Sequence, residues 1–206
     1  MSNHRGLEVT AKPRMSQRAG ILARALNAVI TRRPLGTPPG TAAIRHSSEV
    51  RSMVLVLTLT EIPLAFLVSE ILPPPGRPPH AVLELALILT GFGILAAMAR
   101  NPHTISADRV ALRTGFLGAI ELPRPMVRSA THAMRTIEGR GLRRVPNEAS
   151  AVACSIGSSV NMRVHLEEPL PMDLGDGQSL DVDTVYISAD SPEAVTRALK
   201  NSTVHL

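Results

Sequence analysis

Two long apolar segments constrain this 206-residue chain more than any other feature. The first, Met53–Leu72, reads MVLVLTLTEIPLAFLVSEIL, and the second, Ala81–Ala99, reads AVLELALILTGFGILAAMA. A helix of such a length measures about 30 Å, which matches the hydrocarbon core of a bilayer. The segment 73–80 between them reads PPPGRPPH, which cannot continue a helix and predicts a turn. The sequence therefore predicts a membrane hairpin of two transmembrane α-helices within residues 51–100, with spans at 53–72 and 81–99.

The positive charge of the chain lies almost entirely before the first span. Residues 1–52 carry nine basic and two acidic side chains, whereas the whole chain has a net charge of +5. Arg51 precedes the first span and Arg100 follows the second, and the turn contains only Arg77. Because cytoplasmic flanks of spans are enriched in Lys and Arg, both termini are predicted to be cytoplasmic and the turn 73–80 to lie outside. The expected location is the cell (plasma) membrane.

A basic chain can also bind nucleic acid, but two features argue against that here. The basic excess lies beside a span, where it attracts anionic lipid. The chain contains one Tyr, three Phe and no Trp, which leaves few aromatic rings on which bases could stack. We expect the bilayer as a partner and no nucleic acid.

Each span carries a narrow stripe of small or polar residues along one helical face. The stripes are Thr58, Glu61, Ala65 and Ser69 on the first span and Ala86, Thr90, Gly93 and Ala97 on the second. Small side chains let membrane helices approach closely, and polar ones form hydrogen bonds between them. We expect these faces to pack on each other or to form the seam of a homo-oligomer.

Glu61 lies about 12 Å into the first span, close to the bilayer midplane. An unpaired carboxylate at that depth costs roughly 3 kcal/mol, so it must be protonated, paired or exposed to water. Thr90 on the second span lies about one turn further out. Two interpretations follow: Glu61 relays a proton or ion, or it is a neutral side chain hydrogen-bonded within the hairpin or between protomers.

Residues 1–50 predict a basic, largely disordered cytoplasmic tail, since they contain no aromatic residue and a Pro/Gly-rich stretch at 34–40. Within it, residues 18–30 read RAGILARALNAVI and have an apolar half opposite a polar one. That pattern is typical of a helix lying on the inner leaflet. Disorder and an organelle transit peptide are the alternatives for this segment.

Residues 101–206 predict a mainly-β soluble domain of about seven short strands followed by a C-terminal helix. Apolar and polar residues alternate most clearly at Val160–Leu166. The apolar positions of the last strand change parity near Asp183, which predicts a β-bulge. Asp190 or Ser191 is expected to cap the terminal helix, and Cys154 is expected to be a buried small side chain.

The order of these elements resembles the bacterial pleckstrin-homology-like (PH-like) domains that follow a two-span hairpin in small actinobacterial membrane proteins. The residues that carry the resemblance lie at 104–113, 120–123, 159–164 and 190–194. The resemblance implies a partly open barrel capped by a helix. It implies no activity, because such families mostly lack an assigned one.

The sequence predicts no catalytic, cofactor or metal site. Its seven His residues lack the spacing of helical metal ligands, and the acidic segment 173–177 lacks the pattern of a calcium loop. The one soluble feature that supports a binding hypothesis is a basic stretch containing Arg135, Arg140, Arg143 and Arg144. It is expected either to contact lipid headgroups of the inner leaflet or to be a solvated loop.

Taken together, these patterns predict a non-catalytic scaffold or regulatory protein. The hairpin would tether the β domain to the membrane, where it binds a protein partner or inner-leaflet lipid. The alternative is a small transporter-like or accessory subunit that uses Glu61 within an oligomer.

Overall fold

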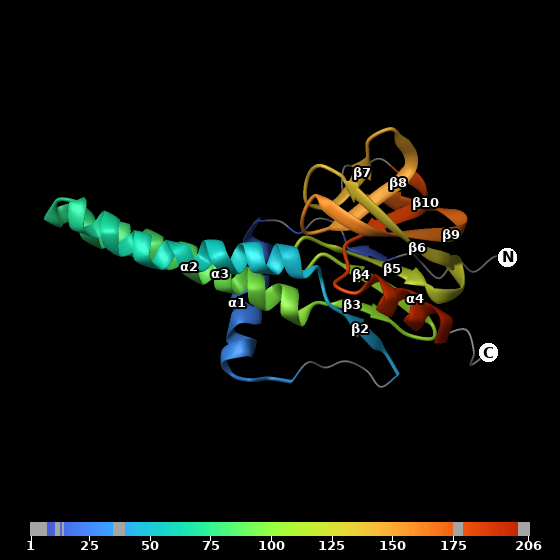
Figure 1. Cartoon of the computed structure of the whole chain (residues 1–206), viewed down its shortest axis with the longest axis horizontal. Coiled ribbons are helices and arrows are strands. Elements are labelled where there is room, and N and C mark those ends of the chain that lie inside the picture. The colour runs from blue at the N-terminus through green and yellow to red at the C-terminus, as the bar shows by residue number, and fades with distance from the viewer. Residues whose placement is uncertain (1–7, 11–12, 14, 35–39, 175–178, 202–206) are drawn as a thin grey trace.

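A computed structural model describes residues 8–10, 13, 15–34, 40–174 and 179–201 of the chain. Two long antiparallel helices, α2 (Ser48–Ile71) and α3 (Arg77–Arg100), project from a mainly-β domain (Figure 1). That domain consists of two sheets and a C-terminal helix, α4 (Pro192–Asn201). The coarse fold class predicted from the sequence is therefore confirmed.

Both helices of the hairpin begin earlier than the apolar pattern predicted. The segment 77–80, which was expected to form part of the turn, is instead the first turn of α3. Proline is tolerated there because the N–H groups of a first helical turn have no partner within the helix. Both helices are long and apolar enough to cross a bilayer, and only 6% and 22% of their apolar windows are buried in the structure.

α2 and α3 pack closely at Thr58 and Gly91. Thr58 is 5% exposed, and a Cβ atom added to Gly91 would overlap its side chain. Nearer the turn, the His80 ring Nε2 lies 3.4 Å from the carbonyl oxygen of Ala65. Thr58 and Ala65 of the expected first-span stripe thus face α3, but they meet Gly91 and His80, which lie outside the expected second-span stripe.

We expect Gly91→Ala to lower the free energy of unfolding of the hairpin by about 1–3 kcal/mol, because its methyl group would overlap the Thr58 side chain. Thermal denaturation of the purified protein in detergent measures the loss. Thr58→Ala in the same chain removes the overlapping atoms and should restore most of it. Gly20→Ala is the matched control, since its Cβ would meet nothing within 4 Å. Equal melting temperatures for Gly91→Ala and the wild type would contradict this prediction.

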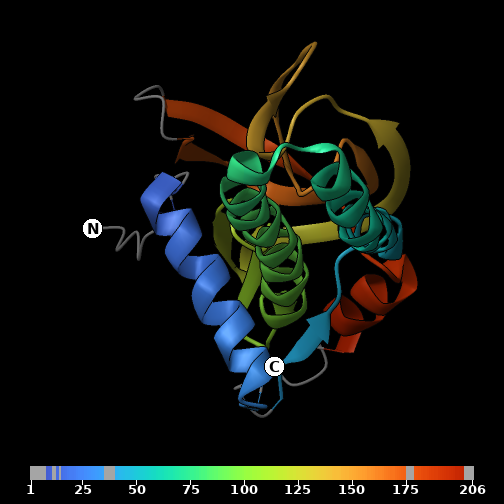
Figure 2. The ribbon, with the colours of Figure 1, turned by 90° about the vertical axis from the view of Figure 1, so that its left-hand side faces the viewer.

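A third helix, α1 (Met15–Ile30), lies across the base of the hairpin (Figure 2). Leu22 of α1 packs on Gly93, where an added Cβ would lie 3.2 Å from the Leu22 Cβ. Ala25 of α1 joins Ala96 and Ala97 of α3 in a small buried cluster. The prediction that Gly93 and Ala97 face the other span is therefore wrong: Gly93 packs on Leu22 of α1, and Ala97 lies in the cluster with Ala25, against which Phe116 also packs.

The first sheet contains five strands in the order β1-β5-β4-β3-β2, with antiparallel neighbours throughout. They are β1 (Glu8–Thr10), β2 (Ala42–Ile44), β3 (His103–Ile105), β4 (Arg109–Arg113) and β5 (Ala119–Pro123). Both edge strands come from residues 1–50, which we expected to be largely disordered. In the described part of that segment, α1 contains the helix expected at 18–30, and β1 and β2 are ordered because strands of the β domain supply their backbone hydrogen bonds.

The second sheet contains five strands in the order β6-β9-β10-β8-β7. They are β6 (Val127–Thr136), β7 (Gly141–Val145), β8 (Glu148–Ser155), β9 (Ser159–Asp173) and β10 (Ser179–Ile187). β10 lies between β8 and β9, parallel to the former and antiparallel to the latter. Its register against β9 shifts between Val182 and Thr184, which confirms the bulge predicted near Asp183.

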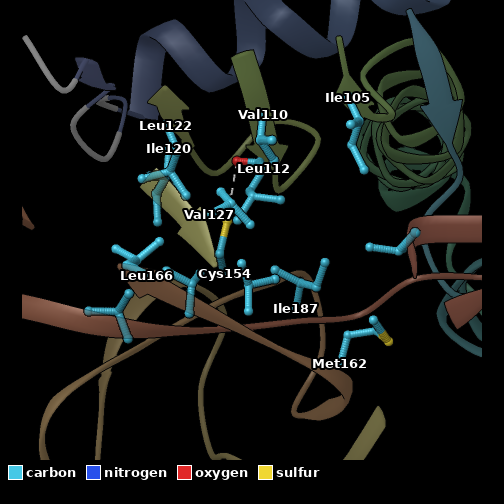
Figure 3. Close-up of a cluster of buried hydrophobic side chains, with 14 of the residues drawn as sticks. Ile105, Val110, Leu112, Ile120, Leu122, Val127, Cys154, Met162, Leu166 and Ile187 are labelled. Atoms are coloured by element: carbon cyan, nitrogen blue, oxygen red, sulfur yellow. Dashed lines mark hydrogen bonds between the residues drawn. The ribbon is translucent and has the colours of Figure 1, made fainter. Parts of the chain in front are cut away.

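The main hydrophobic core lies between the two sheets (Figure 3). The first sheet contributes Ile105, Val110, Leu112, Ile120 and Leu122, and the second contributes Val127, Cys154, Met162, Leu166 and Ile187. Cys154 is fully buried, as predicted, and its Sγ donates to the Leu112 carbonyl oxygen at 3.4 Å. Burial raises the pKa of this thiol to about 12, which keeps it protonated and unreactive at neutral pH. Val195 and Leu199 of α4 complete the core.

The hairpin is attached to the β domain through Asp190. Its Oδ1 accepts the Ser48 N–H at 3.1 Å, and its Oδ2 pairs with Arg51 at 3.2 Å. Asp190 therefore caps the N-terminus of α2, more than 100 residues away in the sequence. The backbone carbonyl of Ser191 accepts the first N–H groups of α4.

Candidate functional site

The outer face of the second sheet, opposite the main core, carries a polar groove of about 690 Å³. Strand alternation directs side chains of four strands outward into it. The outward-facing lining residues are Arg128, Ser129 and Thr131 of β6, Arg163 and His165 of β9, Asp183 and Thr184 of β10, and Glu148 and Ser150 of β8, and the core residue Leu166 of β9 also contributes to the lining. We call these residues the sheet groove.

The floor of the sheet groove is formed by β9. Arg163 lies in register between Thr131 of β6 and Tyr186 of β10, and His165 lies between Ser129 and Thr184. The bulge in β10 places Asp183 beside Thr184 at the groove. Local alternation and one irregularity of register thus bring cationic, acidic and hydroxyl side chains onto one surface.

The acidic side chains of the sheet groove already have partners. Glu148 accepts hydrogen bonds from Arg135 and from the Tyr186 hydroxyl, the latter at 3.0 Å to Oε2. Burial acts to raise the pKa of Glu148, but these two donors hold it below its ordinary value. Asp183 accepts the Ser150 hydroxyl at 2.8 Å. Both carboxylates are therefore neutralised or hydrogen-bonded within the protein.

The sheet groove also contains two guanidinium groups that are not paired with a carboxylate in the described part of the chain, those of Arg128 and Arg163. Among the described residues, neither Arg128 nor Arg163 forms an ion pair. The Arg163 guanidinium lies 5.8 Å from the centroid of the Tyr186 ring, and its Nε is buried with no hydrogen-bond partner. An orphaned buried donor is costly, so this nitrogen is a feature that the fold alone does not explain.

His165 of β9 also lines the groove. Burial, followed by the charge of Arg163, lowers the pKa of His165, and Asp183 offsets part of that effect. Its Nδ1 lies 3.5 Å from the Thr184 hydroxyl oxygen. The Ser150 hydroxyl donates to Asp183, so the described residues form no serine–histidine–carboxylate chain of the kind that nucleophilic catalysis requires.

The predicted basic stretch 135–144 is not one loop in the structure. Arg135 lies in β6 and pairs with Glu148, and Arg144 lies in β7. The Arg143 guanidinium points into its own β6–β7 turn, where it donates to backbone carbonyls. Arg140 is exposed at that turn. The four side chains therefore do not form a common surface for lipid headgroups.

The predicted intramembrane residues are separated by the packing of the hairpin. Glu61 and Ser69 are half-buried on the same side of α2 as Thr58 and Ala65. Ala86 and Thr90 are exposed, and the Thr90 hydroxyl donates to the Ala86 carbonyl oxygen of its own helix at 2.7 Å. Thr90 is thus no partner of Glu61 in the structure. Of the two arrangements expected for the small-residue stripes, Ala86 and Thr90 fit only the seam of a homo-oligomer, because they do not face the other span.

Sequence reasoning did not single out the sheet groove. The alternation of β9, which places Arg163 and His165 opposite the apolar face, was the one signal that could have indicated it. No group of three or more His, Cys, Asp or Glu in the described part of the chain could hold a metal ion. Residues 175–177 of the acidic segment lie outside the described residues.

Comparison with other proteins gives no relative. No protein-family model, curated protein or solved structure matches the chain.

Proposed function

We propose that this is a two-span integral protein of the bacterial plasma membrane that holds a PH-like β domain at the inner leaflet. It acts by binding a protein partner or inner-leaflet lipid rather than by catalysis. Three features of the hairpin and its base support this proposal.

The exposed apolar surface of the hairpin carries the proposal. Side chains such as Phe66, Leu67 and Val82 are 72%, 64% and 70% exposed along helices of 24 residues each. A soluble monomer rarely exposes a contiguous apolar surface of this length. A bilayer removes that surface from water, and each helix satisfies its own backbone hydrogen bonds inside lipid.

The helix that crosses the hairpin base supports the proposed orientation. α1 lies across the hairpin (Figure 2), so a membrane-spanning hairpin would hold α1 in the plane of the bilayer. Val29 and Ile30 of α1 are 48% and 70% exposed, while Arg24, Arg32 and Arg33 are exposed beside them. Apolar and cationic side chains together are typical of helices at an anionic membrane surface. We therefore place α1 and the β domain on the cytoplasmic side.

Turns of the β domain gather at the same base. A Cβ on Gly157 would lie 3.0 Å from a methyl group of Val50 in α2, and one on Gly115 would lie 3.7 Å from Met98 in α3. The β6–β7 turn with Arg140 packs beside them, since a Cβ on Gly141 would lie 3.2 Å from the Leu117 Cβ. Arg140 is therefore the member of the basic stretch that we assign to headgroup contact.

Protease accessibility in oriented membrane vesicles, with an epitope after the last residue, tests the proposal. We expect the epitope to be protected in right-side-out vesicles and cleaved in inverted ones. Cleavage from the outside would overturn the orientation. Extraction of the protein by alkaline carbonate would overturn the membrane span itself.

A second candidate function is suggested by the polar groups of the hairpin. Glu61 is half-buried on the side of α2 that packs on α3, and the Glu84 Oε2 of α3 is buried with no hydrogen-bond partner. Such groups within a span are a feature of proton and ion pathways. Proteoliposomes containing a pH-sensitive dye distinguish the two functions. Dissipation of a proton gradient by the wild type but not by Glu61→Gln would favour the transporter-like function.

A further inference from the structure

We propose that the sheet groove binds the phosphate group of a small phosphorylated polyol or sugar from the aqueous phase. Arg128 and Arg163 would hold the phosphate, and the hydroxyl and acidic side chains would bind the ligand's hydroxyl groups. This proposal does not depend on the side of the membrane that the β domain occupies, so it can fail or hold separately from the proposed function.

With Arg135 beside it, the sheet groove has three guanidinium groups against the two carboxylates of Glu148 and Asp183, which favours an anion. Glu148 is neutralised by Arg135, while the guanidinium groups of Arg128 and Arg163 have no carboxylate partner among the described residues. The buried Nε of Arg163 is a hydrogen-bond donor that has no acceptor within the described parts of the protein. A phosphate monoester carries a charge of about −1.5 to −2 at pH 7 and three acceptor oxygens, which suits two planar guanidinium donors.

The remaining lining of the groove favours hydroxyl groups over a nucleobase. Ser129, Thr131 and Thr184 offer hydroxyl groups, and the Asp183 carboxylate is an acceptor. A base would need a free aromatic face, but the Tyr186 ring is 1% exposed, with Arg135 5.3 Å and Arg163 5.8 Å from its centroid. The volume of about 690 Å³ exceeds that of an isolated ion and lies within the usual range of small-molecule sites.

The position of the groove favours a soluble ligand over a lipid headgroup. The β6–β7 and β8–β9 turns lie near the hairpin base. They are joined to each other by the Ile137 N–H, which donates to the Ser158 carbonyl oxygen. The groove lies toward the opposite ends of these strands, where Val127 pairs with Leu166. If the hairpin spans the bilayer, the lipid headgroups at its base are therefore not adjacent to the sheet groove.

Isothermal titration of the full chain in detergent tests the proposal, with glucose 6-phosphate, inorganic phosphate and glucose as probes. We expect glucose 6-phosphate to bind more tightly than inorganic phosphate, and glucose not to bind. Arg128→Gln should raise the Kd for glucose 6-phosphate about 10- to 100-fold, since a hydrogen bond to a charged group is lost. Arg128 is exposed, so this variant should keep the fold.

Two controls separate the groove from binding elsewhere. Arg197→Gln removes the same charge from an exposed position on α4 and should leave the Kd unchanged. The imidazole resonances of His165, followed by NMR, should report a higher pKa when glucose 6-phosphate is bound, because a phosphate would lie nearby. His165→Gln identifies these resonances.

Three results would overturn the proposal. One is the absence of heat with both phosphate probes at millimolar concentration. Another is equal weakening by Arg128→Gln and Arg197→Gln, which would indicate nonspecific attraction to a basic protein. The third is binding that leaves the His165 resonances unchanged. If vesicles containing a phosphorylated-polyol lipid compete with glucose 6-phosphate, the ligand source is a headgroup and the aqueous assignment fails.

Discussion

Replacing Arg143 by glutamine is expected to lower the free energy of unfolding of the β domain by about 3 kcal/mol. Its guanidinium is the centre of the β6–β7 turn. It donates to the carbonyl oxygens of Glu138, Gly141, Ile137, Ser155 and Gly157 and to the Ser155 hydroxyl, at 2.7–3.4 Å. Burial lowers the pKa of Arg143, yet the group remains charged at any physiological pH.

The expected loss is large because one side chain satisfies several backbone acceptors at once. Glutamine offers a single pair of donors and leaves most of these carbonyls without a partner, which costs more than the bonds contribute. The turn also depends on this geometry, since Gly139 and Gly141 adopt φ values of +98° and +78°.

Urea denaturation followed by Tyr186 fluorescence measures the effect, because the chain has no Trp and this one Tyr. Arg143→Lys keeps the charge but offers three donors from one point, so it should fall between glutamine and the wild type. Arg140→Gln, three residues away and exposed, should change the midpoint little. A midpoint for Arg143→Gln equal to that of Arg140→Gln would refute the structural role of Arg143.

Stability should fall as the pH is lowered from 6.5 to 5, by about 2 kcal/mol from His103 alone. His103 is fully buried where the hairpin joins the β domain. Its Nε2 donates to the Ser188 carbonyl oxygen at 3.2 Å, and its Nδ1 accepts the Arg113 N–H at 3.0 Å. An imidazolium cannot accept that N–H, so the folded protein requires the neutral ring.

The direction follows from where each state binds a proton. Burial, followed by the nearby His46, lowers the pKa of His103 from 6.5 to about 3 in the folded protein. Below pH 6.5 the unfolded chain binds a proton that the folded chain does not, so the folded state loses about 1.4 kcal/mol per pH unit. Burial also lowers the pKa of His46, whose ring lies 4.7 Å from that of His103, and this adds to the slope.

Urea midpoints between pH 7.5 and 5 measure this slope while most carboxylates stay ionised. His103→Asn keeps an acceptor near Arg113 but does not titrate, so it should be less stable at pH 7.5 and have a shallower slope. His132→Asn is the control, because His132 is exposed on β6 and should leave the slope unchanged. A wild-type midpoint independent of pH in this range would contradict the assignment.

Several elements could be predicted from the sequence because neighbouring residues determine them. The apolar runs before and after residues 73–80 predict α2 and α3. The alternation of Val160–Leu166 predicts β9, and the parity change near Asp183 predicts the bulge in β10. Each is a pattern within one segment, either a continuous apolar run long enough to cross a bilayer or an alternation of period 2, and it can be read without knowing what the segment packs against.

The tertiary structure alone decided which segments meet. β1 and β2 are three residues long, too short for a periodic signal, and they form only because strands of the β domain offer free edges. Gly93 faces α1 rather than α2, because folding brings Leu22 of α1 against it. In the sequence, Arg135, Arg140 and Arg143 are equivalent cations. In the fold, Arg135 pairs with Glu148, Arg140 is exposed, and Arg143 donates to backbone carbonyl oxygens that include those of Ser155 and Gly157. The three differ because, among the described residues, the tertiary structure brings partners from other strands and turns to two of them and not to the third.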